Sequence, residues 1–188
     1  PASLGAFEEL QLNTLNKVCF SGSVMPCKYL KIWQEHLPEA LFVNQYGPTE
    51  ATASCTYYVV DHKVEEDEVL PIGGSYENYK VFLLTDENLL PTGEIASVEG
   101  TPMDFRETQQ GEEGEICVAG PILALGYYND VERTAASFIQ NPLNSLYQET
   151  IYKTGDIGCF TEDGILWFKG RKDRQIKHMG HRVELDEV

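Results

Sequence analysis

The sequence lacks any hydrophobic run long enough to cross a membrane, and it is poor in positive charge. Its longest apolar stretches, such as Val81 to Leu84, have the length of a strand rather than the roughly 20 residues of a membrane span. The 188 residues include 14 Lys and Arg against 30 Asp and Glu, which gives a formal net charge of −16. Nucleic-acid backbones and anionic membranes repel so acidic a chain, so we expect neither as a partner.

Cysteine pairs with redox or metal-binding spacing are also absent. The five cysteines are odd in number and include no C-x-x-C pair, and Cys19, Cys117 and Cys159 lie in apolar, strand-like runs. This pattern favours reduced, buried thiols in a cytoplasmic protein. The pair His178 and His181 has no cysteine or carboxylate partner at ligand spacing, so it is weak evidence for zinc.

The sequence does contain enough apolar material for a core. Hydrophobic residues make up 42% and aromatic residues 11% of the chain, which excludes a disordered acidic tail. The N-terminal residues have neither a basic start nor a long apolar stretch, so no signal peptide is predicted. Because the chain begins with Pro1 rather than Met, we expect a piece of a longer gene product.

Residues 17–60 show the alternation of strand and helix that is typical of an α/β sheet. A short apolar run over 17–20 predicts a strand, and Pro26 suits the first turn of a helix. The apolar positions of this helix recur at helical spacing, at Leu30, Trp33 and Leu37. Two further strands are predicted over 41–43 and 53–60, with a loop over 44–50 between them.

Beyond residue 61 the signals change to short strands that are cut by turns. An acidic run over 61–68 predicts a solvated loop, and Asp163-Gly164 is a strong hairpin signal. Residues 86–113 are rich in Pro, Gly and charge and predict a long loop. The expected strands lie over 80–84, 115–119, 151–152 and 157–160.

One helix interrupts this β-rich region. Asn129 is its expected N-cap, with Glu132 three residues later, and Val131, Ala135 and Phe138 form the expected buried face. We therefore predict a small barrel or sandwich that carries one helix. The whole chain is expected to be α+β, with an α/β piece over 1–70, the β-rich subdomain over 71–170, and a separate segment over 171–188.

The segment 44–50 carries residues that suit a nucleotide. The Tyr46 ring can offer a flat face to a base, and Gly47 permits close approach of the backbone. Thr49 can donate to a phosphate oxygen, and Glu50 can hold Mg²⁺, which prefers one or two carboxylates together with phosphate oxygens. The alternative is a plain turn, because Gly-Pro is common in loops.

Two later segments offer complementary groups. In residues 152–157, an aspartate fixed by a tight glycine turn at the start of a strand can accept both hydroxyls of a ribose; the alternative is a capped β-turn. Residues 170–185 are basic in an acidic chain, and Arg171 can bond to ribose or phosphate. The alternative there is a solvated β-ribbon with alternating charges.

Four segments together resemble one known family. They are YGPTEAT (46–52), GEICVAGPILALGYYND (114–130), YKTGDIG (152–158) and GRKDRQIKHMGHRVEL (170–185). In this order and spacing they resemble the adenylate-forming enzymes, which include amino-acid adenylation domains and acyl-CoA synthetases. FSGSVMP (20–26) and NQYGPTEAT (44–52), with Pro48, are most similar to D-alanine–carrier protein ligases and amino-acid adenylation domains.

The resemblance implies that the chain is part of the family's large domain, whose β-rich subdomain is a small distorted β-barrel. It implies ATP and Mg²⁺ as cofactors, with Thr49 and Glu50 as catalytic residues and Glu50 as the Mg²⁺ ligand. Tyr46 would stack on adenine and Asp156 would hold the ribose. The expected ATP and AMP contacts are Asn44, Tyr46, Gly47, Thr49, Asp156 and Arg171.

The family also implies a moving C-terminal domain, whose hinge and first residues would lie within 171–188, and an acyl pocket. Asp173 matches the hinge, and Lys177 and Gly180 fall in the segment that swings to the active site. Ser21, Gly22 and Ser23 match the stretch that lines the acyl pocket. D-alanine ligases usually have Cys-Gly-Glu where this chain has Ser-Gly-Ser, so the identity of the substrate stays open.

The function implied is activation of a carboxylic or amino acid, with D-alanine among the candidates, as an acyl-AMP. The acyl group would then pass to the phosphopantetheine thiol of an acyl or peptidyl carrier protein. An acyl- or aryl-CoA synthetase that uses CoA is the first alternative, and a non-catalytic interaction module is the second. The family's phosphate loop and its lysine-bearing C-terminal domain are not in the sequence, so the chain by itself is expected to be inactive.

Overall fold

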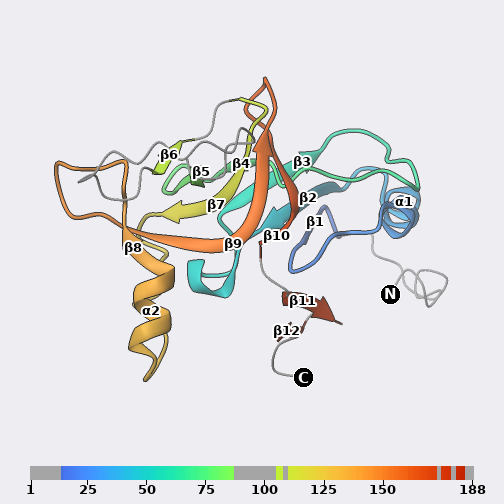
Figure 1. Ribbon diagram of the computed structural model, residues 1–188. Coiled ribbons are helices and arrows are strands. Elements are labelled where there is room, and N and C mark those ends of the chain that lie inside the picture. Colours follow the sequence, from blue (N-terminus) through green and yellow to red (C-terminus); the bar gives the residue numbers. More distant parts are fainter. Residues whose placement is uncertain (1–13, 87–104, 108–109, 173–174, 179–180, 185–188) are drawn as a thin grey trace.

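The computed structural model describes residues 14–86, 105–107, 110–172, 175–178 and 181–184 (Figure 1). Two sheets lie side by side, and a separate antiparallel ribbon is formed by β11 (Gln175–His178) and β12 (His181–Glu184). The mixture of two sheets with few helices confirms the predicted α+β class. Among the described residues, no helix is both long enough and apolar enough to span a bilayer.

The first sheet has the strand order β1-β2-β3-β4. Its elements are β1 (Lys17–Phe20), α1 (Cys27–His36), β2 (Leu41–Tyr46), β3 (Thr56–Val60) and β4 (Gly74–Ser75). β1 and β2 are parallel and joined through α1, whereas β3 and β4 are added antiparallel. The expected strand, helix and strand are thus confirmed.

Helix α1 forms where the sequence predicted it because its apolar residues face the sheet. Leu30 is 1% exposed and packs with Phe42 of β2 and Val60 of β3. Pro26 is the residue that caps the N-terminus, and the helix ends before Leu37, whose N–H bonds to the Trp33 carbonyl. Burial of this apolar face fixes the helix on the sheet.

The second sheet is antiparallel, with the order β10-β9-β7-β5-β6 and with β8 beside β9. Figure 1 shows β9 bending along its length toward its hairpin with β10. The predicted Asp163-Gly164 turn joins these two strands. The strands are β5 (Lys80–Asp86), β6 (Phe105–Glu107), β7 (Glu113–Ala119), β8 (Phe138–Gln140), β9 (Thr150–Phe160) and β10 (Leu166–Arg171).

Three strand boundaries differ from the expectation. β2 continues through Tyr46, because residues 44–46 pair with β3, so the predicted loop over 44–50 is shorter. β3 begins at Thr56 rather than Ala53, since Ala53 has a left-handed backbone with φ of 73°. β6 lies within the expected 86–113 loop, and residues 87–104 and 108–109 lie outside the described residues.

The glycine turn predicted within residues 152–157 is also corrected. The two short strands expected around it are one strand, β9, of 11 residues. Gly155 has φ of +73°, and the register between β9 and β7 shifts near Glu115. Gly155 suggested a turn because glycine readily adopts positive φ. In the structure, the same glycine forms a β-bulge inside a continuous strand.

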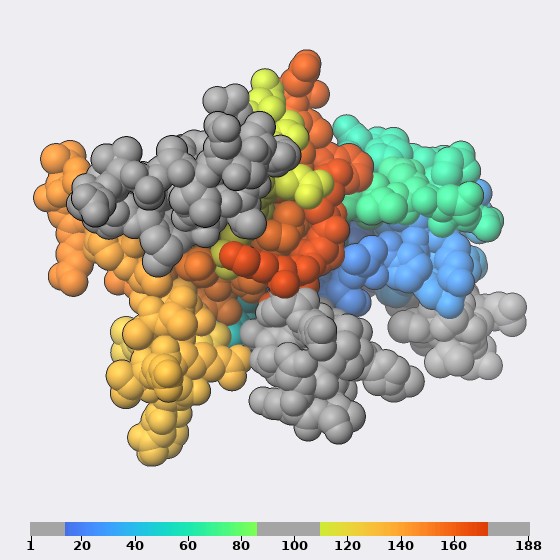
Figure 2. Space-filling model, viewed as in Figure 1, coloured from blue at the N-terminus to red at the C-terminus, as the bar shows by residue number. Residues whose placement is uncertain are grey.

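Helix α2 (Val131–Ser137) begins and packs differently from the prediction. Its N-cap is Asp130, whose carboxylate accepts a hydrogen bond from the Arg133 N–H, whereas Asn129 stands outside with φ of 55°. None of its residues is buried, Val131 is 83% exposed, and Phe138 already belongs to β8. Figures 1 and 2 show the helix projecting from the body, in agreement with the lack of buried residues in it.

The cysteines are free thiols, as expected, but they are not all buried. Cys27, Cys55 and Cys117 are buried, Cys159 is intermediate and Cys19 is exposed. Cys19 lies on β1, which among the described residues pairs with β2 alone, so one edge of this strand is open. Burial raises the pKa of the Cys55 thiol to about 12, which keeps that thiol protonated and unreactive.

The two sheets are joined by a shared hydrophobic cluster. One side of this cluster comes from the segment that forms the first sheet and consists of Tyr46, Ala51 and Cys55. The other side comes from the second sheet and consists of Leu83, Ile116, Val118 and Leu166. Backbone bonds cross the same boundary, from Ile72 N to Leu166 O and from Leu166 N to Gly73 O, each at 2.9 Å. The two sheets are therefore joined by a packed interface, which we call the seam.

Candidate functional site

Tyr46 and Asp156 meet at this seam although they are 110 residues apart in the sequence. Tyr46 is the last residue of β2, and its hydroxyl donates a hydrogen bond to Asp156 Oδ2 at 2.6 Å. Asp156 lies in β9 directly after the Gly155 bulge and is 5% exposed. Burial, and then the charge of Asp156, raise the pKa of Tyr46 well above its ordinary value, so the phenol stays protonated.

Arg171 reaches the same carboxylate from the neighbouring strand. It is the cross-strand partner of Asp156 in the β9–β10 pair, and its guanidinium donates to Asp156 Oδ1. The side chains of Arg171 and Asp156 are 16% and 7% exposed, so this is a largely buried ion pair. Thr154 supports it, accepting a hydrogen bond from the Asp156 N–H at 3.0 Å. Tyr46, Asp156 and Arg171 thus form one polar cluster.

Glu50 forms the centre of a second polar cluster. It lies in the short 3-10 helix η3 (Thr49–Ala51) after Pro48 and is 7% exposed. Its Oε1 accepts a hydrogen bond from the Tyr127 hydroxyl at 2.6 Å, and the Tyr152 hydroxyl lies 3.3 Å from that of Tyr127. Burial, and then the hydrogen bond with Tyr127, raise the pKa of Tyr152 above its ordinary value. Two phenols therefore surround the carboxylate.

The other predicted nucleotide contacts lie near Tyr46. The Asn44 side chain is buried and donates to the Pro71 carbonyl at 2.8 Å. Gly47 packs so closely on the backbone that a Cβ there would lie 2.6 Å from Ser54 Cα, so a side chain would not fit without a shift. Thr49 is exposed at the start of η3.

The expected acyl-pocket and hinge residues are only partly placed. Ser21, Gly22 and Ser23 are exposed and follow β1, whose last residue, Phe20, is in register with Asn44. They therefore lie at the same edge of the sheet as the end of β2. Asp173 and Gly180 lie outside the described residues, and Lys177 is placed only as a position in β11.

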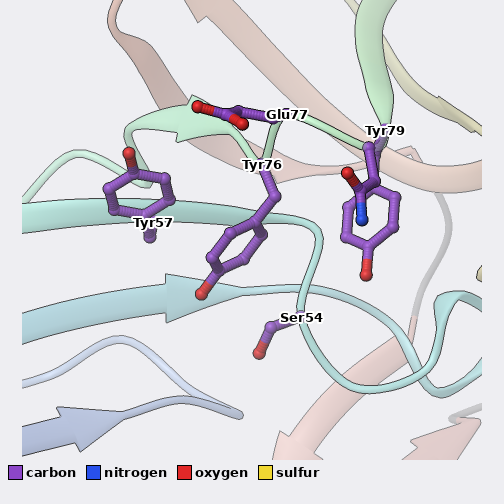
Figure 3. Close-up of a pocket in the computed structure, with 6 residues that line it drawn as sticks. Ser54, Tyr57, Tyr76, Glu77 and Tyr79 are labelled. Atoms are coloured by element: carbon purple, nitrogen blue, oxygen red, sulfur yellow. The ribbon is translucent and has the colours of Figure 1, made fainter.

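A separate open pocket of about 490 Å³ lies near the face of β2 that carries the Gln45 side chain. Figure 3 shows the tyrosine rings and Glu77 that line it. The Gln45 side chain donates to the Tyr76 hydroxyl at 2.6 Å, and successive strand residues point to opposite faces. The pocket is thus across the strand from Asn44 and Tyr46. Its lining residues are Ser54, Tyr57, Tyr76, Glu77, Asn78 and Tyr79.

Comparison with known proteins decides the family. The family model described as AMP-binding enzyme matches residues 2–128, which is more than half of the chain. The chain belongs to the AMP-binding enzymes. The resemblance to adenylate-forming enzymes is therefore confirmed as a family assignment.

Relatives of this AMP-binding chain include carrier-protein ligases and peptide synthetases. It is 34% identical to D-alanine–D-alanyl carrier protein ligase of Bacillus cytotoxicus, covering 97% of this chain and 32% of that protein. It is also 34% identical to bacitracin synthase 1 of Bacillus licheniformis, covering 94% of this chain and 3% of that protein. The chain thus spans about a third of the first relative's length and much less of the second's.

Solved structures agree with the fold. A structure of holo-PA1221, described as an NRPS protein containing adenylation and PCP domains bound to a vinylsulfonamide inhibitor, is similar to this chain with a TM-score of 0.76. The identity is 31%, and the match covers 93% of this chain and 28% of that one.

The residues that hold Glu50 in this AMP-binding chain are not among those to which the sequence assigned a role. Tyr127 and Tyr152 stand inside the quoted segments, but no role was predicted for either. Tyr127 is followed by a second tyrosine, Tyr128, which is 95% exposed. Sequence alone offers no means of telling which of the two adjacent phenols points inward, because the loop that carries them has no regular period.

Proposed function

We propose that this chain forms the nucleotide-binding part of an ATP-dependent ligase that activates an amino acid as an aminoacyl-AMP. The activated acyl group would pass to the phosphopantetheine thiol of a carrier protein. The observation that carries this proposal is the contact of Tyr46 with Asp156, which is itself paired with Arg171. An aromatic ring, a carboxylate and a guanidinium, drawn from distant segments, meet at one seam.

In the proposed complex, Asp156 holds the ribose of ATP. A carboxylate has about four acceptor positions, and hydroxyl groups are suitable donors to them. The Tyr46 ring is only 9% exposed here, so stacking on adenine requires it to turn away from Asp156. The ribose hydroxyls then replace the Tyr46 hydroxyl on Asp156, and the buried carboxylate keeps its hydrogen bonds.

The donor set also fits Mg²⁺. This ion usually takes one or two protein carboxylates and completes its shell with substrate phosphates and water. The described residues contain no group of three or more His, Cys, Asp or Glu that could form an all-protein cage. We therefore propose that Glu50 supplies the protein carboxylate, and bound Mg²⁺ would neutralise charge on the phosphate oxygens. Exposed Thr49 donates to a phosphate oxygen.

The acid and the acceptor are proposed from the relatives. D-alanine–D-alanyl carrier protein ligase is named for an amino acid and a carrier protein, and PA1221 contains adenylation and PCP domains. Ser21, Gly22 and Ser23 lie beside the end of β2, where an acid could approach the α-phosphate. An acyl- or aryl-CoA synthetase would share the nucleotide contacts and differ in its acid and acceptor. A non-catalytic module would not need a buried Asp156–Arg171 pair beside Tyr46.

Pyrophosphate exchange tests the proposal directly. The intact gene product should incorporate labelled pyrophosphate into ATP when an amino acid is supplied, whereas the 188-residue chain alone should show no exchange. Exchange that depends on fatty or aryl acids instead would favour the CoA synthetase. Full exchange by the 188-residue chain, or no ATP binding by the intact product, would contradict the proposal.

A further inference from the structure

One loop from the second part of the molecule holds Glu50. Residues 120–130 connect β7 to α2, and they contribute Tyr127, whose hydroxyl donates to Glu50 Oε1 at 2.6 Å. The same loop contacts the backbone of η3: the Ala124 N–H bonds to Glu50 O at 2.8 Å, and Thr52 Oγ1 donates to Ile122 O at 2.7 Å. Main chain and side chain of Glu50 are therefore bound by one segment.

Tyr127 is itself fixed on several sides. Its N–H donates to Thr134 Oγ1 at 2.9 Å, and its ring lies edge-on to Phe138 at 5.9 Å between centroids. The Arg133 guanidinium lies over the same ring, 4.3 Å from its centroid. A phenol held in this way presents its hydroxyl in one direction. Gly126 allows the approach, because a Cβ there would lie 2.5 Å from the Thr134 side chain.

A glutamate in a short 3-10 turn would otherwise have several side-chain rotamers. Binding an ion through such a carboxylate requires one rotamer, and ordering it at the moment of binding reduces affinity. A hydrogen bond to an ionised carboxylate is among the stronger kinds, so the Tyr127 hydroxyl can select that rotamer in advance. Preorganisation of a ligand by a second residue is a common requirement of metal sites.

We propose that Tyr127 is a positioning residue, whose hydroxyl holds the Glu50 carboxylate in the orientation that receives ATP-bound Mg²⁺. Tyr152, whose hydroxyl contacts that of Tyr127, supports it from β9. The inference rests on the proposed function, because it gives Tyr127 a role only if Glu50 binds the ion. The loop that carries Tyr127, which follows strand β7 of the second sheet, then controls the Mg²⁺ dependence of the site. The carboxylate of that site, Glu50, follows strand β2 of the first sheet.

The test compares the affinity of the intact gene product for ATP in Mg²⁺ and in EDTA, by calorimetry. The readout is the ratio of the two affinities, since a general folding defect lowers both and leaves the ratio unchanged. Tyr127→Phe should lower the ratio about tenfold, as expected for a lost hydrogen bond to a charged group. The matched control is Tyr128→Phe, which removes an adjacent, 95% exposed hydroxyl and should leave the ratio unchanged.

Tyr152→Phe provides a second, weaker variant. It keeps the bond from Tyr127 to Glu50, so the ratio should fall only about threefold. If Tyr127→Phe does not fold, this variant decides: a threefold fall supports the proposal, and an unchanged ratio overturns it.

Other results distinguish a failure of the positioning role from a failure of the proposed function. If the wild type responds to Mg²⁺ and Tyr127→Phe responds equally, the positioning role is wrong while the proposed function stands. An equal loss in Tyr128→Phe also overturns the positioning role. A wild type whose affinity for ATP does not respond to Mg²⁺ overturns the proposed function, and this inference with it.

Discussion

The first sheet and the seam bury their apolar residues in different ways. Helix α1 packs on the first sheet in a cluster drawn from one continuous stretch, from Cys27 to Leu70. The seam cluster joins Tyr46 to Leu166 and depends on contacts between segments far apart in the sequence. Both candidate polar clusters, around Asp156 and around Glu50, involve residues from both sides of the seam.

Because of this difference, a mutation in one cluster should affect other properties than a mutation in the other. Leu30 under α1 and Tyr46 at the seam belong to different hydrophobic clusters. A defect under α1 should therefore cost stability without changing the site. A defect at the seam alters the relative placement of Tyr46, Glu50 and Asp156, so it should cost stability and nucleotide affinity together.

Asp156→Ala should have the largest effect. It leaves the Arg171 guanidinium, 16% exposed, without its carboxylate partner at the seam. Removing one member of a buried ion pair costs about 3–5 kcal/mol of unfolding free energy. Urea unfolding of the 188-residue chain measures this, and a loss below about 1 kcal/mol would show that the pair is not buried in solution. ATP binding to the intact gene product should also be lost.

Leu166→Ala and Leu30→Ala form a matched pair across the two regions. Leu166 is 0% exposed at the seam and Leu30 is 1% exposed under α1, so each change should cost about 2–5 kcal/mol of unfolding free energy. Only Leu166→Ala should also weaken ATP binding, about tenfold or more, as measured by calorimetry on the intact gene product. Equal losses of affinity in both variants would remove the distinction between the regions.

Two substitutions at Tyr46 distinguish the contribution of its ring to ATP binding from that of its hydroxyl. Tyr46→Leu removes the proposed adenine platform and should cost about 1–3 kcal/mol of ATP binding free energy. Tyr46→Phe keeps the ring, and because ribose replaces the hydroxyl on Asp156 in the proposed complex, its ATP affinity should stay within about threefold of the wild type. If Phe and Leu weaken binding equally in calorimetry, the stacking role is wrong.

His62, near α1, should have the smallest effect. The hydrogen bond with Glu68, at 2.7 Å, raises the pKa of His62 above its ordinary value, although its side chain is 42% exposed. A raised pKa means that this stabilisation is present at pH below about 6.5 and is lost as pH rises through the higher folded value. Screening keeps it below about 1 kcal/mol.

Thermal unfolding of wild type and His62→Gln measures this term. The wild type should be more stable than the variant at pH 5.5, and the difference should shrink by pH 8.5. ATP affinity should not change with the substitution. A difference that grows with pH would reverse the assigned sign.

Local patterns in the sequence were enough to predict much of the fold. The spacing of Leu30 and Leu37 and the Asp163-Gly164 turn are local signals, and both are confirmed. The bulge at Gly155 could not be predicted, because a glycine that needs positive φ looks the same in a turn and in a bulged strand. Its identity depends on pairing with β7, about 40 residues away.

The candidate site shows the same limit. The quoted segments contain every residue expected at the nucleotide, yet the partners that surround those residues follow from the packing of the seam. Asn129 and Asp130 are both good caps, and the left-handed backbone at Asn129 decides between them. Likewise, only the fold shows that Tyr127 faces Glu50 while Tyr128 faces solvent.

A crystal structure of the intact gene product with a non-hydrolysable ATP analogue and Mg²⁺ would be the decisive measurement. The expected density has the ribose hydroxyls on Asp156, the adenine against the Tyr46 ring, and Mg²⁺ on Glu50 with Tyr127 still bonded to that carboxylate. A nucleotide bound away from the seam, with the Tyr46–Asp156 hydrogen bond undisturbed, would contradict the proposed site.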